Sequence, residues 1–342
     1  MYELGMAVVG LGRLGYVHAL NIAHTPRAHL IAVCDMQAEL AQKTASEFGC
    51  ACYTDVRNML ENPEIDAVCV ATPTAYHVDP VKAVVEAKKP LFCEKPLADN
   101  LDDTLCLAKM IQDAGIICQV GFQRRFDPPC AEAAHMIQAG LIGKPVYISS
   151  FSRDPFPPPP WACDPNKGGG LFIDMLIHDF DLARFLMQDE VVSIFGDETN
   201  LVVNSEGIER FADNVTVSYR FRNGALGTAH ASMHAGYGYD VRGEVYGEKG
   251  NLILGGLNRT ELMFCSVENG ITKPATFQPQ GKLPHFMLRF KEAYEREIQA
   301  FVECVIEHKA PCVNENDAVQ AFKIALAATK SAGIKQPVVI EF

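Results

Sequence analysis

The stretch GMAVVGLGRLG, residues 5 to 15, decides the first half of the fold. An apolar run leads into a glycine-rich turn, and a segment with helical periodicity follows at residues 13 to 24. In such a strand–turn–helix unit the first glycine allows a tight turn, the second lets the backbone approach a pyrophosphate, and the third lets helix and strand pack closely. The sequence therefore predicts a dinucleotide-binding unit; the alternative is a glycine turn that packs without a ligand.

An acidic residue in the right place indicates which dinucleotide would bind. Asp35 ends the next apolar run, HLIAVC, 20 residues after Gly15. A carboxylate there can bond both ribose hydroxyls and would repel a 2′-phosphate. Met36 and Gln37 follow and supply no Arg for such a phosphate, so NAD is favoured over NADP. The cofactor contacts predicted in this region are Gly10, Gly12, Arg13, Leu14, Gly15 and Asp35.

The alternation of segments predicts the fold class. Apolar runs between residues 5 and 121 alternate with helical segments near 13 to 24, 37 to 48, 77 to 88 and 101 to 114. The runs are apolar throughout, as in strands covered on both faces. We therefore expect an α/β domain with a parallel, Rossmann-type sheet over residues 1 to 122.

Residues 123 to 342 have a different pattern. Segments such as NVTVSYRF and VRGEVYG alternate or are rich in β-branched and aromatic residues, with turn residues between them. Two helical stretches, 284 to 308 and 315 to 332, precede a final strand-like PVVIEF. This predicts an α+β domain for substrate binding and oligomerisation, with a large, mostly antiparallel sheet. In an alternative arrangement, the last helices pack back on the first domain.

Polar residues at two strand ends of the first domain are candidates for the site. Thr72 and Pro73 leave the run DAVCVAT, and His77 lies in the first turn of the next helix, where it is either a ligand contact or an exposed residue beside a helix cap. Lys95 follows the run PLFCE, and Pro96 is a candidate for a cis peptide bond. Ligands of open α/β sheets bind at the carboxyl ends of the strands, so Thr72, Pro73, His77 and Lys95 are predicted to contact the cofactor.

A narrow polar stripe marks the helical stretch FIDMLIHDFDLARFL, residues 172 to 186. At about 100° per residue, Asp174, His178 and Asp181 fall within roughly 60° of one another on an otherwise apolar helix. A solvated face is normally broader and richer in Lys and Glu. We expect a mostly buried helix whose stripe faces something polar; the alternative is a capping Asp and a satisfied buried His.

The composition excludes several classes of protein. The 342 residues are 48% hydrophobic and suit two domains, and 30 Lys and Arg against 42 Asp and Glu give a net charge of −12, which argues against a nucleic-acid surface. We expect no signal peptide and no transmembrane segment. The twelve cysteines include no CxxC pair and several sit in apolar runs, so we expect no metal site and a reducing cytoplasm.

Three motifs in order give the chain a resemblance to the Gfo/Idh/MocA family of nicotinamide-dependent oxidoreductases over essentially its whole length. They are GLGRLG at 10 to 15, EKP at 94 to 96, and GGGLFIDMLIHDFD at 168 to 181, which is similar to the family's GGxxxDxxxH segment. Within the family the chain is most similar to inositol 2-dehydrogenases. That likeness is carried by GFQRRFDP (121 to 128), SRDPFPPPP (152 to 160), DMLIHDFDLARFL (174 to 186) and AGYGYDVRGEVYG (235 to 247), and the Pro-rich loop 156 to 166 is expected to cover the substrate.

The resemblance implies catalytic roles that alcohol oxidation also requires. Such a reaction needs a base for the hydroxyl proton, and His178 is the candidate, oriented by Asp174. Lys95 is expected to donate to the same oxygen, and Glu94 either contacts the cofactor ribose or supports Lys95. The implied substrate contacts are Gln123, Arg124, Asp174, His178, Asp181 and Tyr237. Asp181 has a second interpretation as a supporting partner, and Arg125 is expected in a structural ion pair.

The resulting hypothesis is NAD-dependent oxidation of a cyclic polyol, myo- or scyllo-inositol, to the inosose by hydride transfer. One alternative is a dehydrogenase or reductase of another sugar or sugar-derived ketone in the same family. A non-catalytic NAD(H)-binding regulator is a second alternative, although such a protein would be expected to lose the Lys or the His. The resemblance also implies a homo-oligomer, a tetramer or a dimer.

Overall fold

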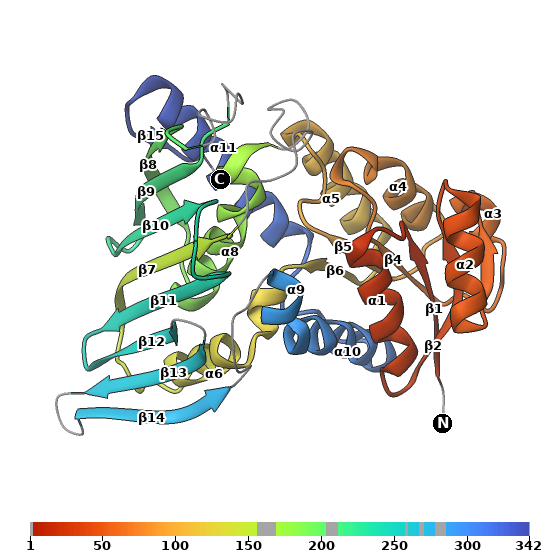
Figure 1. The fold of residues 1–342 in the computed structure, drawn as a ribbon, viewed down its shortest axis with the longest axis horizontal. Coiled ribbons are helices and arrows are strands. Elements are labelled where there is room, and N and C mark those ends of the chain that lie inside the picture. The colour runs from red at the N-terminus through yellow and green to blue at the C-terminus, as the bar shows by residue number, and fades with distance from the viewer. Residues whose placement is uncertain are drawn as a thin grey trace. The chain divides into compact units, whose positions relative to one another are not determined.

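A computed structural model gives the fold and describes residues 3–155, 169–202, 211–256, 259–266, 270–277 and 285–341 (Figure 1). The chain divides into two compact units. The first comprises Met1–Gln123 and Glu292–Val319, and the second comprises Arg124–Lys291 and Gln320–Phe342. The Pro-rich loop expected over the substrate, 156 to 166, lies outside the described residues.

The first unit contains a parallel six-stranded sheet in the order β3-β2-β1-β4-β5-β6, which confirms the predicted Rossmann-type fold. Its strands are β1 (Leu4–Val9), β2 (Ala28–Cys34), β3 (Ala51–Tyr53), β4 (Ala67–Val70), β5 (Leu91–Glu94) and β6 (Cys118–Gly121). The helices between them are α1 (Arg13–His24), α2 (Ala38–Phe48), α3 (Val56–Leu60), η1 (Thr74–Tyr76), α4 (Val78–Glu86) and α5 (Leu101–Ala114). The sequence patterns did not predict β3, because its three residues are exposed or half-exposed and form no apolar run.

Both faces of this sheet are covered, as its continuous apolar strands require. In β4, Ala67 and Cys69 belong to a core shared with α1 and α2, while the alternating Val68 and Val70 are equally buried and point to the opposite face. A late segment of the chain joins the same core: α10 (Lys291–Glu307) contributes apolar side chains to it. These are Ile298, Phe301, Val302 and Val305.

The second unit contains a nine-stranded sheet in the order β14-β13-β12-β11-β7-β10-β9-β8-β15. All neighbouring pairs are antiparallel except β7 with β10, which confirms the predicted mostly antiparallel sheet. The strands are β7 (Pro145–Arg153), β8 (Val191–Thr199), β9 (Asn214–Phe221), β10 (Leu226–Ser232), β11 (Asp240–Gly247), β12 (Gly250–Gly256), β13 (Arg259–Ser266), β14 (Gly270–Phe277) and β15 (Val338–Val339). The remaining helices are η2 (Gln123–Phe126), α6 (Pro128–Gln138), α7 (Gly170–Asp174), α8 (Leu176–Met187), α9 (Phe286–Arg289) and α11 (Glu315–Ile334).

One face of the nine-stranded sheet carries the core of the second unit. In β7 the residues Ile148, Ser150 and Ser152 are buried while their neighbours are only partly buried, the period of two expected of a sheet with one covered face. Helices α6 and α8 pack on the covered face and share its apolar cluster. In the part of the chain that the structure describes, no helix is both long and apolar enough to cross a membrane.

Candidate active site

The glycine turn after β1 leaves free space in front of helix α1. Gly10 has a φ of 88°, and a Cβ there would lie 2.6 Å from the backbone nitrogen of Thr72. A Cβ on Gly15 would lie 1.9 Å from the Gly10 carbonyl oxygen, so both positions require glycine. At Gly12 a Cβ would meet nothing within 4 Å. Gly12 is also the N-cap of α1 and no side chain caps that end, so its amides are available to an anion. Together these features fit a dinucleotide pyrophosphate.

Asp35 lies at the carboxyl end of β2 beside this turn. Its Oδ2 accepts a hydrogen bond from the Leu11 amide at 2.8 Å, and its Oδ1 accepts one from the Gln37 amide at 2.9 Å. The side chain is only half-buried, and a carboxylate offers about four acceptor positions. Capacity for ribose hydroxyls therefore remains after both backbone bonds are made.

The loop after β4 carries three of the predicted cofactor contacts. Thr72 lies against Gly10, and Pro73 is the exposed N-cap of η1. His77 is 1% exposed, with Nδ1 2.9 Å from the Pro96 carbonyl oxygen and Nε2 2.8 Å from the Thr72 carbonyl oxygen. Burial lowers the pKa of His77, while the carbonyl oxygens act in the opposite direction. His77 is thus not an exposed residue beside a cap, because its ring joins two strand-end loops; its contact with the cofactor stays a prediction.

Lys95 stands at the carboxyl end of β5, as predicted, and its side chain is half-buried. The Lys95–Pro96 peptide is cis. Glu94 is 6% exposed: its Oε1 lies 2.7 Å from His18 Nε2, and its Oε2 accepts the Lys95 amide at 3.2 Å. Of the two alternatives for Glu94, this geometry fits support of Lys95 rather than contact with the ribose.

The polar stripe lies at a break between two helices rather than on one continuous helix. Asp174 is the last residue of α7 and is exposed, and His178 lies in the first turn of α8 and is half-buried. Met175 separates the helices, and its carbonyl accepts the His178 amide at 3.3 Å. The two residues proposed as an orienting carboxylate and a base are therefore both partly accessible to solvent.

Arg124, predicted as a polyol contact, is part of a buried ion pair, and its contact with a polyol stays a prediction. It is 2% exposed, with Nη1 3.0 Å from Asp179 Oδ2 and Nη2 donating to Ser152 Oγ at 2.9 Å. Ser152 in turn donates to Asp179 at 2.6 Å. Burial is the largest single influence and lowers the pKa of Arg124, but Asp179, Tyr239 and Cys130 together outweigh burial, so the pKa is raised. The guanidinium thus fixes η2 to α8 and β7.

Arg125, the next residue, makes the structural ion pair that was expected. Its Nε donates to Asp181 Oδ2 at 2.8 Å and its Nη2 to Asp181 Oδ1 at 2.5 Å. Asp181 is fully buried and also lies 3.9 Å from Arg184 Nη1. Of its two interpretations, the supporting partner fits this geometry, and a contact with the substrate stays a prediction.

The last two predicted substrate contacts differ in exposure. Gln123 is 3% exposed and its Nε2 donates to the Tyr294 hydroxyl at 3.3 Å; its contact with a polyol stays a prediction. Tyr237 is 38% exposed; its hydroxyl donates to Asp240 Oδ2 at 2.8 Å and accepts from Arg153 Nη1 at 2.9 Å. Tyr237 is accessible, although its hydroxyl already has protein partners.

Sequence reasoning missed the residues that support this site. Asp179 and Ser152 hold Arg124, and Asp127 pairs with Arg289 through two bonds of 2.9 and 2.8 Å. The sequence did contain a signal for the pairing of Asp179 with Arg124. Asp179 and Asp181 lie on an apolar helix, so each needs a positively charged partner, and the adjacent Arg124 and Arg125 can supply both. For Asp127 and Arg289, 162 positions apart, we find no local signal.

Comparisons with known proteins agree with this geometry. The family model described as "Oxidoreductase family, NAD-binding Rossmann fold" matches residues 4–122, and the model of the GFO/IDH/MocA C-terminal domain matches residues 130–253. The chain is 38% identical to scyllo-inositol 2-dehydrogenase (NAD(+)) of Bacillus subtilis strain 168, over 99% of this chain and 97% of the relative. It is 35% identical to myo-inositol 2-dehydrogenase of Thermotoga maritima, over 98% of both chains.

A solved structure is also similar to this chain over nearly its full length. Scyllo-inositol dehydrogenase from Lactobacillus casei with bound NAD(H) and scyllo-inositol superimposes with a TM-score of 0.85 at 27% identity, over 98% of this chain and 99% of that one. The two family models together, and each of these full-length similarities, cover the glycine turn, Lys95 and the α7–α8 segment. The chain belongs to the GFO/IDH/MocA family of oxidoreductases, with an NAD-binding Rossmann fold followed by that family's C-terminal domain.

Proposed function

We propose that this protein is an NAD-dependent oxidoreductase that oxidises a cyclic polyol, myo- or scyllo-inositol, to the corresponding inosose. The observation that carries the proposal is the full-length similarity, at 38% and 35% identity, to two inositol 2-dehydrogenases. The glycine turn and Asp35 support the same cofactor independently, because they leave room for a pyrophosphate and acceptors for a ribose. NAD, when bound, accepts the hydride.

The residues proposed to hold the cofactor come from four strand ends of one sheet. Gly10, Gly12, Arg13, Leu14 and Gly15 form the turn and the first turn of α1, where backbone amides meet the phosphates. Asp35 binds the ribose at the end of β2. Thr72 and Pro73 line the edge after β4, and Lys95 stands after β5.

Three residues are proposed to carry out the chemistry. His178 removes the hydroxyl proton as the hydride leaves the carbon, since an imidazole titrates in the useful pH range. Asp174, at the helix break before it, orients the ring and stabilises the imidazolium. Lys95 donates to the reacting oxygen and stabilises the developing alkoxide. Tyr237 is proposed to contact other hydroxyls of the polyol ring.

The test is NADH formation followed by absorbance at mildly alkaline pH. The panel contains myo-, scyllo- and D-chiro-inositol, glucose and xylose, each with NAD and with NADP. We expect one inositol to be oxidised with NAD at a kcat/KM above that of either sugar. Turnover of the sugars alone would move the substrate within the family, and NADH binding without turnover of any polyol would favour a regulator.

One variant completes this test. We expect Lys95→Ala to lower kcat by about a hundredfold or more, the usual contribution of a group that manages the reacting proton, while NADH still binds. Lys109→Ala is the matched control, because Lys109 is an exposed residue of α5 that pairs with Asp113. Full turnover by Lys95→Ala would remove Lys95 from the mechanism.

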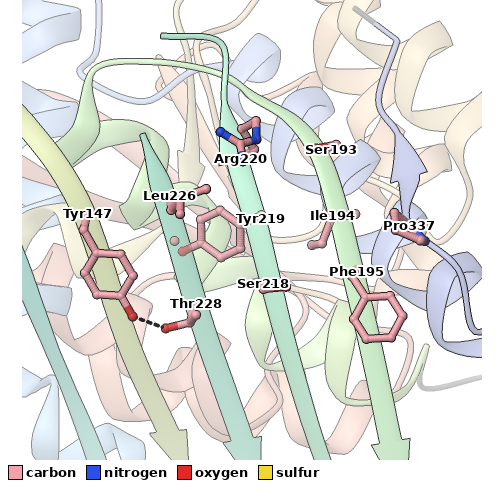
Figure 2. A pocket seen from close by; sticks show the side chains of 11 residues that line it. Tyr147, Ser193, Ile194, Phe195, Ser218, Tyr219, Arg220, Leu226, Thr228 and Pro337 are labelled. Carbon is pink, nitrogen blue, oxygen red and sulfur yellow. Dashed lines mark hydrogen bonds between the residues drawn. The ribbon is translucent and has the colours of Figure 1, made fainter. Parts of the chain in front are cut away.

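The uncovered face of the nine-stranded sheet is proposed to pair with a second copy of this chain. A hollow of about 320 Å³ on this sheet is lined by Phe195, Leu226 and Tyr147, with Arg220 and Pro337 at its margin (Figure 2). Phe195 and Leu226 are 37% and 45% exposed. Exposed apolar side chains gathered on one sheet face favour a protein interface over bulk solvent. A dimer or tetramer would cover them.

We also propose that the protein works in a reducing compartment, the cytoplasm. The ten cysteines whose side chains the structure describes are all free thiols. Cys69, Cys93 and Cys118 are fully buried, and burial raises their pKa well above the ordinary value. They act as small core residues rather than as reactive groups.

A further inference from the structure

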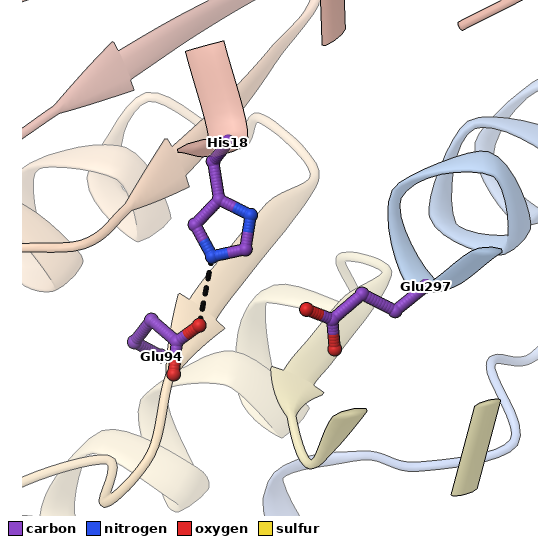
Figure 3. A group of neighbouring side chains, drawn as sticks. All are labelled: His18, Glu94 and Glu297. Carbon is purple, nitrogen blue, oxygen red and sulfur yellow. Dashed lines mark hydrogen bonds and ion pairs between the residues drawn. The ribbon is translucent and has the colours of Figure 1, made fainter. Parts of the chain in front are cut away.

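Three titratable side chains meet in the interior of the first unit, directly behind Lys95. They are His18 of α1, Glu94 of β5 and Glu297 of α10 (Figure 3). His18 and Glu297 are 0% exposed and Glu94 is 6% exposed. One nitrogen or oxygen atom from each lies within 4.8 Å of those from the other two. Two carboxylates therefore lie close together in the interior of the first unit.

The partners of the two carboxylates are unequal. Glu94 is bonded to His18 Nε2 at 2.7 Å and to the Lys95 amide at 3.2 Å. Both carboxylate oxygens of Glu297 are buried, and among the described residues neither has a hydrogen-bond partner. Figure 3 shows this carboxylate directed toward the His18–Glu94 pair. An ionised carboxylate in that position would be desolvated, unpaired and next to a like charge, which is strongly unfavourable.

Among the residues described, no Lys or Arg side chain is bonded to the Glu297 carboxylate. From α1 comes His18, whose Nε2 is bonded to Glu94, and from β4 comes the buried Cys69 thiol. β5 supplies Glu94, and β6 supplies Gln119, whose amide donates to the Glu297 backbone carbonyl at 2.8 Å. On α10 itself the neighbouring Tyr294 packs its ring against His18. Burial first, and then the charge of Glu94, raises the pKa of Glu297 well above its ordinary value.

We propose that Glu297 is a positioning residue that carries a proton at neutral pH and, as a neutral acid, holds the Glu94 carboxylate against His18 and the Lys95 backbone. The acid proton can be donated to Glu94 directly or through one buried water, since a span of up to 4.8 Å admits a bridging water. Glu94 then keeps one orientation, and its bond to the Lys95 amide keeps the backbone of Lys95 in place.

The protonation state is tested by unfolding, without any substrate. Glu297→Gln keeps the shape of the neutral acid but cannot ionise. In the unfolded chain Glu297 ionises above about pH 4.3, whereas in the folded chain it stays neutral to a higher pH, so rising pH favours the unfolded wild type. The quantity to follow is the unfolding equilibrium constant of wild type divided by that of Glu297→Gln. We expect this ratio to rise by up to tenfold per pH unit, from about pH 5 until Glu297 ionises in the folded protein.

The control is Glu303→Gln, the same change at an exposed position of α10. The unfolding constant of wild type divided by that of Glu303→Gln should not rise with pH in this way. If the ratio of the unfolding constants of wild type and Glu297→Gln stays level or falls with rising pH, Glu297 is ionised in the folded protein. That result would overturn the proposal. Infrared difference spectra of wild type minus Glu297→Gln give a direct reading. We expect a protonated carboxylic acid band at pH 7, and its absence also overturns the proposal.

The positioning role rests on the proposed function and has its own readout. Glu297→Leu removes the donor, and Glu297→Gln retains a donating amide. We expect Glu297→Leu to lower kcat about tenfold with little change in the KM for NAD, and Glu297→Gln to restore most of it. Equal kcat in both variants would overturn positioning. If no polyol is turned over at all, the proposed function fails while the unfolding and infrared results still decide the protonation.

A divalent metal ion is the competing occupant of this cluster. Elemental analysis of the purified wild type would then show one equivalent of metal, and Glu297→Gln would lose it. The unfolding ratio would also fall with rising pH, because metal ligands must be ionised. That combination would replace the protonated acid with a metal site.

Discussion

Asp35 bonds two backbone amides with the same carboxylate that is proposed to bind the NAD ribose. The bonds to Leu11 and Gln37 join the glycine turn to the start of α2, so the residue orders the cofactor edge before any ligand arrives. A charged acceptor strengthens such bonds and also repels a 2′-phosphate. At this scale one side chain contributes both to loop order and to cofactor choice.

We expect Asp35→Asn to weaken NAD more than NADP. The variant keeps the size of the side chain but loses the charge, so the KM for NAD should rise about tenfold, as for a lost charge-assisted hydrogen bond, and the preference for NAD should fall. Steady-state kinetics with both cofactors measures this. Asp66→Asn is the matched control, because Asp66 accepts the Gly5 amide at 2.8 Å at the start of β1, away from the carboxyl edge. An unaltered cofactor preference would exclude Asp35 as the ribose ligand.

Burial separates the polar residues of the second unit into two groups. Arg124, Arg125, Asp179 and Asp181 are buried and paired, whereas Asp174 is exposed and His178 half-buried. Residue type alone does not distinguish these roles, since each group contains an Asp from the same stripe.

At the scale of elements, η2 holds α8 through two successive arginines. Arg124 pairs with Asp179 and Arg125 with Asp181, two positions apart on the helix. Both ion pairs are desolvated, so removal of one partner leaves a buried charge without compensation. The first turn of α8 carries His178, and the position of His178 therefore depends on these two buried ion pairs.

Substitutions in α7 and α8 should separate stability from catalysis. We expect Asp181→Asn to lower the free energy of unfolding by about 3–5 kcal/mol, the usual cost of breaking a buried ion pair. Asp174→Asn, at the exposed end of α7, should change stability by about 0.5 kcal/mol or less while turnover falls. Urea unfolding and polyol kinetics measure both. If Asp181→Asn instead kept full stability and raised the KM for the polyol, Asp181 would be a substrate ligand after all.

At the scale of the molecule, the two sheets differ in how many of their faces are covered. The parallel sheet of the first unit is covered on both faces, partly by α10, which follows β14 of the second sheet in the chain. The nine-stranded sheet has one covered face and one that carries exposed apolar residues around a hollow. The second arrangement leaves the surface that we propose pairs with another copy of the chain.

Charges placed in this hollow should dissociate the assembly. We expect wild type to sediment as a dimer or tetramer of the 37.5 kDa chain, and Phe195→Glu with Leu226→Glu to shift it toward the monomer, because a buried unpaired carboxylate opposes association. Leu105→Glu, at a 42% exposed position of α5, serves as the control. A monomeric wild type, or an assembly that tolerates both charges, would contradict the proposed interface.

The sequence by itself determined the features that depend on near neighbours along the chain. Apolar runs and helical periodicity placed four helices of the first unit within about three residues of their observed ends, a precision typical of boundary prediction. The glycine turn and Asp35 indicated the cofactor, and three motifs indicated the family. Each of these signals lies within a few dozen residues, where the physics of turns, strands and helix ends is local.

Only the tertiary structure decided which polar residues are buried and with which partners. The pairs Arg125–Asp181 and Asp127–Arg289 join positions 56 and 162 apart, and Glu297 meets Glu94 only because α10 returns to the first sheet. A charged residue in a sequence has the same chemistry whether it faces solvent, substrate or a counter-ion. What assigns its role is desolvation and the partner that the fold brings near, and both arise from packing between distant segments.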